Sequence, residues 1–151
     1  MSRVLAVTSL FAAGAPLPRR ADAQIAVIVS RSSPLQSVTS DELKRMFLGS
    51  TKAFADLTPV MLVEYPPLRQ AFYRSALALS DLQFKRHWIK LVFSGEVVTP
   101  PSQIADEPEV RRFVASHPGA IGFLPLSAVD GTVRALTVDG HAPSDPAYKI
   151  R

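Results

Sequence analysis

The sequence contains no cysteine, one tryptophan and only three histidines. The lack of cysteine excludes disulfide frameworks, thiolate zinc sites and cysteine nucleophiles together. Charged residues are also few, at 20% of the chain, whereas hydrophobic residues make up 47%. This balance is typical of a globular domain with an apolar core and argues against intrinsic disorder. The length of 151 residues fits one domain.

The motifs of common enzyme sites are missing as well. No glycine-rich loop ends in Gly-Lys-Ser or Gly-Lys-Thr at the spacing of a phosphate loop, and no serine stands in a nucleophile elbow. The three histidines, His87, His117 and His141, are far apart along the chain. We therefore expect a binding protein rather than an enzyme, with no cofactor and no bound metal.

The first 23 residues have the pattern of a secretory signal peptide. Arg3 precedes an apolar run from Val4 to Ala15, and Ala21-Asp22-Ala23 forms a small-x-small cleavage site. The run is too short to span a bilayer, which takes about 20 apolar residues. We expect cleavage after Ala23, and a mature domain at 24–151 that is periplasmic or secreted.

Arg19 and Arg20 are unusual in this pattern because they lie between the apolar run and the cleavage site. A misassigned start codon or a buried N-terminal helix is the alternative interpretation. Removal of residues 1–23 leaves 14 basic and 12 acidic residues, a formal charge of +2. A nearly neutral mature chain gives no reason to expect nucleic-acid binding.

Strand and helix patterns alternate along the mature chain. Apolar runs bounded by turn residues predict strands at 25–29, 59–64, 120–124 and 133–138. Capping boxes and helical spacing predict helices from Thr39 to a stop at Gly49, from Pro67 to Leu79, from Ser80 to Phe93 and from Pro108 to Ser116. The tail from His141 has no such pattern and is expected to be loosely held. The alternation predicts a single α/β domain with a mostly parallel sheet flanked by helices.

The helix at 80–93 carries the only tryptophan. Trp88 lies in its apolar stripe, so we favour a core position over stacking on a ligand. Arg86, His87 and Lys90 lie opposite this stripe. A solvated surface is the favoured interpretation, and contact with anionic lipid or an acidic partner is the alternative.

Four segments also occur in an order and spacing that indicate a known family. They are Ile25–Val29 with the Ser/Pro turn after it, Leu43–Gly49 (LKRMFLG), Phe72–Arg74 (FYR) and Pro118–Phe123 (PGAIGF). Together they resemble the substrate-binding proteins of phosphate ABC transporters, which have the type 2 periplasmic-binding-protein fold. The resemblance runs from about residue 25 to residue 138. It implies a reduced member of that family with a single lobe.

In that family, phosphate lies between two lobes and is held by backbone amides, hydroxyls and an arginine. The turn that would contribute here, 63–69, lacks the family's serine, threonine and glycines, and it contains Glu64 and two prolines instead. Proline removes amides that would face an anion. The resemblance therefore leaves Ser32, Ser33, Tyr65 and Arg69 as candidate ligand-binding residues.

Two functions follow from this resemblance. The first is an exported, non-catalytic solute-binding protein of a phosphate ABC transporter, with a small oxyanion such as phosphate as ligand and a membrane transporter as partner. The alternative is an envelope protein-interaction module that keeps the fold and has lost the anion site. A single lobe has no hinged cleft, so tight ligand binding needs a second copy or another envelope protein as the opposite wall.

Overall fold

The structure is a computed structural model that describes residues 24–151, so the predicted signal peptide lies outside the described residues. The strands are β1 Ile25–Ser30, β2 Ser37–Val38, β3 Met61–Glu64, β4 Ser102–Gln103, β5 Ala120–Pro125, β6 Val133–Ala135 and β7 Thr137–Val138. The helices are α1 Ser40–Phe47, α2 Arg69–Leu77, α3 Asp81–Phe93 and α4 Glu107–Ser116, with short 3-10 helices at Pro66–Leu68 and Leu126–Ala128. None of the helices in 24–151 is long and apolar enough to cross a bilayer.

The central sheet has the strand order β4-β3-β5-β1-β6. β3 pairs in parallel with β4 and β5, and β1 pairs antiparallel with β5 and β6. Four of the five strands thus point the same way, which confirms a mostly parallel sheet, and β1 is the exception. The predicted strand at 133–138 is divided in two, because β7 leaves this sheet and pairs with β2.

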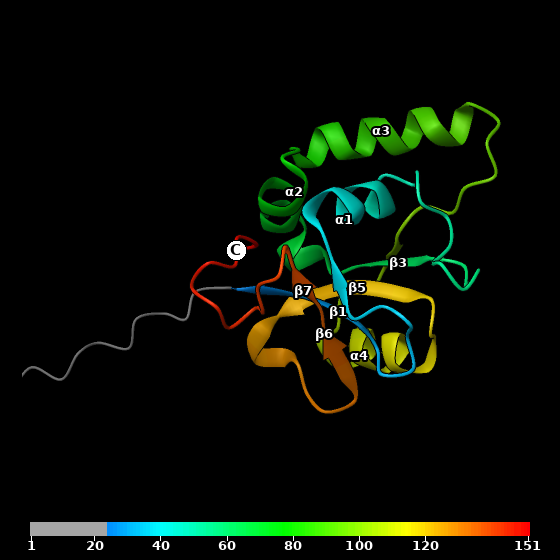
Figure 1. Ribbon diagram of the computed structural model, residues 1–151. Helices are drawn as coiled ribbons and strands as arrows, with labels where there is room; N and C mark the ends of the chain where they lie inside the picture. Colours follow the sequence, from blue (N-terminus) through cyan, green and yellow to red (C-terminus); the bar gives the residue numbers. More distant parts are fainter. Residues whose placement is uncertain (1–23) are drawn as a thin grey trace, which may run out of the picture.

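Helices cover both faces of the sheet, with α1, α2 and α3 on one face and α4 on the other (Figure 1). β1 is buried along its whole length, as predicted from its unbroken apolar run. Alternate side chains of a strand point to opposite faces. Ile25, Val27 and Val29 accordingly join the core beneath α1–α3, and Ala26 and Ile28 join the core against α4.

Two capping boxes begin helices where the sequence predicted them. The Thr39 side chain accepts from the Glu42 amide at the start of α1, and Ser80 accepts from the Gln83 amide at the start of α3. The Glu42 and Gln83 side chains bond back to the respective N-cap amides. Each box satisfies amides that have no partner within the helix. Gly49 takes a φ of 75° just after α1, the conformation that ends helices.

Trp88 lies in the core, as predicted. Its indole Nε1 donates to the Phe47 carbonyl over 3.1 Å, at the end of α1. His87 is half-buried, and its Nε2 lies 2.7 Å from the Leu48 carbonyl. The imidazole therefore contacts the end of α1, so the expected solvated surface of α3 does not include His87.

The expectation of a loosely held tail was wrong. Tyr148 and Ile150 are buried in the main core. The Tyr148 hydroxyl donates to the Ile25 carbonyl over 2.9 Å, and the Ile25 amide donates to the Ile150 carbonyl over 3.1 Å. Two well-spaced apolar residues thus suffice to anchor a segment that shows no periodic pattern.

Candidate functional site

The candidate site lies where β3 ends and α2 begins. Two prolines occupy the first positions of the 3-10 helix at 66–68, where their fixed φ suits a helix start. Neither has an amide hydrogen. The next two amides are used within the turn, because Leu68 donates to the Tyr65 carbonyl and Arg69 to the Pro66 carbonyl. The amides of residues 66–69 therefore offer no cradle to an anion.

Glu64, the last residue of β3, is a buried carboxylate. Tyr73, one helix turn beyond the start of α2, donates its hydroxyl to Glu64 Oε2, and Arg69 Nη1 lies 3.3 Å from Glu64 Oε1. Burial raises the pKa of Tyr73 well above its usual value, and the hydrogen bond to Glu64 adds to this. The hydroxyl is therefore a permanent donor, and the buried charge of Glu64 is partnered on both oxygens.

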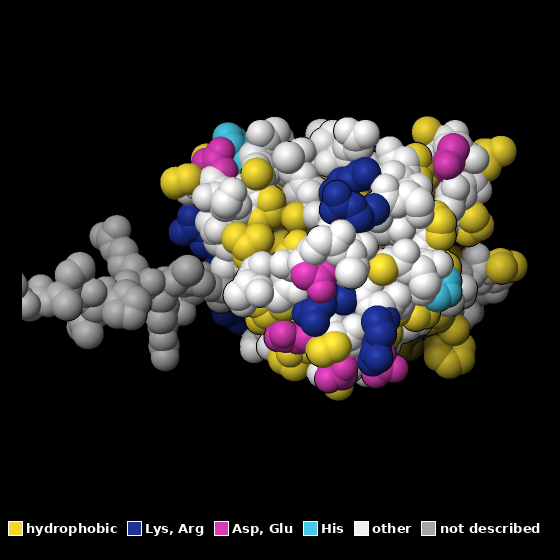
Figure 2. All heavy atoms as spheres, turned by 90° about the horizontal axis from the view of Figure 1, so that it is seen from below, with side chains coloured by type: hydrophobic (Ala, Val, Ile, Leu, Met, Phe, Trp, Pro, Cys, Tyr) yellow, Lys and Arg dark blue, Asp and Glu magenta, His cyan; other side chains and the backbone are white. Residues whose placement is uncertain are grey.

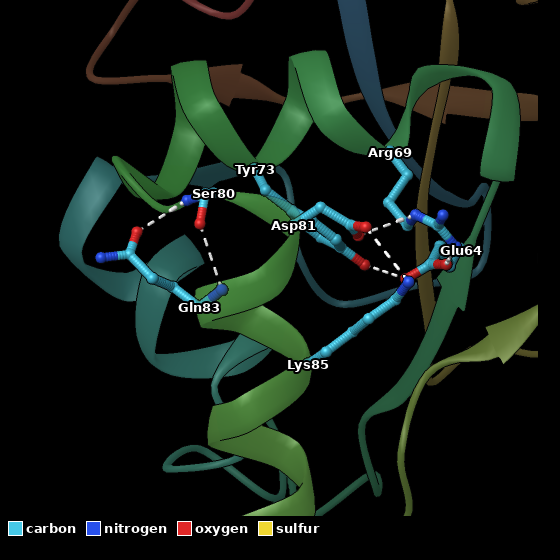
Figure 3. Close-up of polar contacts among 7 residues, drawn as sticks. All are labelled: Glu64, Arg69, Tyr73, Ser80, Asp81, Gln83 and Lys85. Carbon is cyan, nitrogen blue, oxygen red and sulfur yellow. Dashed lines mark hydrogen bonds and ion pairs between the residues drawn. The ribbon is translucent and has the colours of Figure 1, made fainter.

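Arg69 connects Glu64 to a second carboxylate at the start of α3. Its Nε lies 2.9 Å from Asp81 Oδ1, and Lys85, one turn further along α3, approaches Asp81 Oδ2 at 3.1 Å. Figure 3 shows these four side chains converging from β3, α2 and α3. Asp81 Oδ1 is buried and accepts no hydrogen bond, so its contact with Arg69 is an ion pair only.

A groove of about 340 Å³ opens beside this charge cluster, between α3 and the segment around β4. Its polar lining consists of the four residues above and Gln103. Its walls are apolar and consist of Phe84, Trp88, Ile89, Val92, Phe93, Pro100 and Pro101. Such a volume accommodates a small organic molecule, and apolar walls with a few converging polar groups are usual for ligand sites.

Tyr65 lies close to this site but faces another partner. It is half-buried, and its hydroxyl donates to Glu107 Oε1 at the start of α4 over 3.3 Å. Burial and the neighbouring Glu107 carboxylate raise the pKa of Tyr65. Among the sequence candidates, Tyr65 and Arg69 thus lie on the same turn, and Arg69 alone lines the groove.

Ser32 and Ser33 lie elsewhere. The Ser32 hydroxyl is 2.9 Å from the Ser30 hydroxyl, and buried Ser33 accepts from the Leu35 amide over 3.2 Å. These bonds stabilise the turn after β1. β1 runs antiparallel to β5, and Val29 lies opposite Ile121 near the start of β5. The serine turn is therefore at the amino ends of β3 and β5, whereas Tyr65 and Arg69 follow the carboxyl end of β3.

Sequence reasoning missed most of the groove. The sequence predicts a helix from Ser80 and a core position for Trp88, but it indicates no role for Asp81 or Lys85. The spacing of Asp81 and Lys85, four residues apart on one helix, was an available signal for an ion pair. Nothing in the sequence indicated that Arg69 would reach Asp81 on the next helix.

The opposite side of the molecule has a different character. Figure 2, seen from below, shows Lys and Arg side chains interspersed with Asp and Glu on this face, with no continuous basic surface. Within residues 24–151, no three histidine or acidic side chains come together in a way that could hold a metal ion.

No family model matches the chain. A curated relative, the phosphate-binding protein PstS of Bacillus subtilis, is 29% identical over 135 residues, which cover 81% of this chain and 40% of the relative. Among solved structures, PstS from Borrelia burgdorferi matches with a TM-score of 0.63 at 12% identity, over 83% of this chain and 53% of that one. An ABC-type phosphate transport receptor from Vibrio cholerae matches with a TM-score of 0.55 at 15% identity, over 80% and 48%.

These comparisons confirm the resemblance predicted from the sequence, in fold and in sequence pattern. The chain spans about half the length of the proteins that it matches. The relatives are named as a binding protein and a transport receptor, in agreement with the expectation of a protein that is not an enzyme.

Proposed function

We propose that this chain is an exported, non-catalytic solute-binding lobe that takes a small ligand in the groove beside Arg69. The observation that carries the proposal is the groove itself, which combines a ligand-sized volume, apolar walls and converging charges. It lies beyond the carboxyl end of β3, and ligands of open α/β sheets bind outside the carboxyl ends of the strands. The fold shared with phosphate receptors supports the same role.

The relatives' names make phosphate the first ligand to test, and Arg69 would be the cation that meets it. Arg69 already contacts two carboxylates, Glu64 and Asp81. An oxyanion would have to replace one of them without help from the amides of 66–69. An open groove on one lobe also needs an opposite wall, which a membrane transporter, another envelope protein or a second copy would supply.

A second function, an envelope protein-interaction module, is favoured by one observation. The end of α3 and the loop after it expose large apolar side chains, with Phe93 85% and Val97 93% exposed. Apolar residues gathered beside a groove often mark an interaction site. In this alternative the groove receives part of another protein instead of a free solute.

Trp88 provides a direct test, because it is the only tryptophan and lines the groove. The purified protein is titrated with phosphate, sulfate and a panel of small amines, alcohols and carboxylates, and both tryptophan fluorescence and the melting temperature are followed. Solute binding predicts a saturable fluorescence change for at least one compound. At 100 times its dissociation constant that compound adds about 2.7 kcal/mol, a shift of several degrees.

The Arg69→Ala variant tests whether the response arises in the groove, and Arg111→Ala is the matched control. Arg111 has similar exposure and also forms an ion pair, but it pairs with Asp130, outside the groove. A phosphate response lost in the Arg69 variant alone supports the oxyanion ligand. A panel in which no compound produces a response rejects solute binding and leaves the interaction module.

A further inference from the structure

α3 has a second apolar stripe, and this one faces solvent. Phe84 and Trp88 pack into the core from the inner face of the helix. Leu82, Ile89 and Phe93 follow one another at intervals of seven and four residues, about two turns and one turn, so they lie in line along another face. Their exposed fractions are 55%, 58% and 85%. These three side chains are called the outer ridge of α3 below.

The outer ridge belongs to a concentration of exposed apolar surface. Seven large hydrophobic side chains are exposed in residues 24–151, and five of them are the outer ridge, Val92 and Val97. Val97, in the loop after α3, is 93% exposed. α3 is also the outermost helix over its face of the sheet (Figure 1). Clustered apolar side chains of this kind mark a surface that contacts another body.

Two cations lie beside the outer ridge. Arg86 is four residues from Leu82 and three from Ile89, and Lys90 is three residues from Phe93, the spacings at which helix side chains are neighbours. Both cations are exposed, and neither forms an ion pair with another residue in 24–151. The other charges around α3 pair among themselves, Glu64 and Asp81 with Arg69 and Lys85, and Glu96 with Lys52. The unpaired charge beside the outer ridge is therefore positive.

This combination of charge and apolar surface narrows the choice of partner. A second copy does not fit, because two outer ridges in contact would bring two positively charged faces together. An acidic protein would complement the charge, but lysine is depleted at the centre of protein interfaces. Helices that lie on membranes, in contrast, combine Lys and Arg with exposed Leu and Phe. The aliphatic stems of Arg86 and Lys90 can lie along the apolar surface while their charged ends reach lipid phosphates.

We propose that the outer ridge of α3 docks the protein on an anionic membrane surface, with Phe93 between the lipid headgroups and Arg86 and Lys90 beside lipid phosphates. This role goes beyond the proposed solute-binding function and does not depend on an occupied groove. Ile89 and Phe93 also line the groove, so docking brings the groove next to the membrane in which a transporter would lie.

The test measures sedimentation of the protein with vesicles of phosphatidylcholine alone, or of phosphatidylcholine and phosphatidylglycerol in equal parts. The domain 24–151 is used, because its own residues form both cores on the sheet and it omits the apolar run at 4–15. We expect binding to the anionic vesicles to be stronger by about 10-fold or more, since each basic residue near an anionic leaflet contributes. Added salt should weaken this binding.

Phe93→Ser tests the apolar contact and should weaken binding to the anionic vesicles about 10-fold, because the most exposed ring of the outer ridge is lost. Leu57→Ser is the matched control. Leu57 is also a large apolar side chain, 82% exposed, but it lies in the loop before β3. Its replacement should leave vesicle binding unchanged.

Arg86→Gln tests the charge and should weaken binding about 5-fold, with a smaller dependence on salt than that of the wild type. Arg112→Gln is the matched control, since it removes the same charge from an exposed residue of α4, on the opposite face of the sheet (Figure 1). All four substitutions replace exposed side chains, so the melting temperatures should stay close to that of the wild type.

Each contrary outcome overturns a stated part of the proposal. Equal binding to neutral and anionic vesicles would show that Arg86 and Lys90 do not select the surface. Equal losses in a test variant and its control would show that the contact is not made by α3. If neither kind of vesicle binds, the membrane is rejected and a protein partner is left for this face. The solute titrations are independent, so vesicle binding without any solute response would reject the proposed function alone.

Discussion

The Tyr73 hydroxyl on α2 donates a hydrogen bond to the Glu64 carboxylate at the end of β3, inside the core. Glu64 would otherwise bring a negative charge into the apolar layer beneath α2 with Arg69 as its sole partner. A buried charge is tolerated only when it is paired and hydrogen-bonded. This bond therefore fixes the start of α2 to the end of β3 and holds the polar lining of the groove in place.

Replacement of Tyr73 by Phe should destabilise the protein by about 1.5–3 kcal/mol, because the donor to a charged acceptor is lost and no water can take its place. Urea unfolding at neutral pH measures the change. Tyr65→Phe is the control, since Tyr65 is only half-buried and its hydroxyl bonds to Glu107 at 3.3 Å. Equal losses of stability in the two variants would show that the Tyr73 hydroxyl does not stabilise the buried Glu64 carboxylate.

Gly119 should tolerate no side chain. A Cβ at this position would lie 2.0 Å from the Pro59 carbonyl oxygen, and the backbone there is held by the bond from the Met61 amide to the Gly119 carbonyl. Gly119→Ala must separate β3 from β5, and we expect a loss of about 3 kcal/mol. Gly131→Ala is the control, because nothing lies within 4 Å of its Cβ. Thermal unfolding of the two variants should differ by several degrees, and similar midpoints would contradict the close approach.

Local signals in the sequence predicted most of the elements. These signals are the capping boxes at Thr39 and Ser80, the stop at Gly49 and the apolar run of β1. Each acts within a few residues, so the helix or strand that it marks can be predicted without the rest of the chain. The direction of β1 was not predictable in this way. An apolar run looks the same in a parallel and an antiparallel strand, and only the path of the chain decides between them.

The candidate site was harder to predict because its contacts join distant segments. Arg69 was expected to be available to an anion, and the structure pairs it with Asp81, which begins the next helix. The serine turn and Arg69 are on opposite ends of the sheet because β1 runs against β5. A sequence pattern shows which side chains are chemically suited to bind a ligand. Which groups those side chains contact depends on tertiary packing.

Tyr148 should contribute to stability through its bond to the Ile25 carbonyl. Tyr148→Phe should cost about 1 kcal/mol at pH 7, the usual net value of a buried hydrogen bond. Burial raises the pKa of Tyr148 to about 12, above the value of about 10 for an unfolded tyrosine. The protonated form thus stabilises the fold below pH 10, and this contribution is lost as the pH rises from 10 to 12. Urea unfolding should show the wild-type advantage shrinking over that range; an advantage that stays constant would contradict this assignment.

Asp139 should make stability sensitive to acid. Its carboxylate accepts from the Ser40 hydroxyl and from the Ser40 amide over 2.8 Å, and these bonds lower the pKa of Asp139. A lowered pKa stabilises the fold above the unfolded value of about 3.9, and the contribution is lost as the pH falls through the folded value. Asp139→Asn keeps the left-handed φ of 51°, which asparagine tolerates. The substitution should cost about 0.5 kcal/mol at pH 6, since the carboxylate is exposed, and progressively less as the pH falls below about 3.9. Melting temperatures of both proteins measured from pH 6 down to acid pH test this, and a difference between them that does not shrink as the pH falls would assign the effect to the turn instead of the charge.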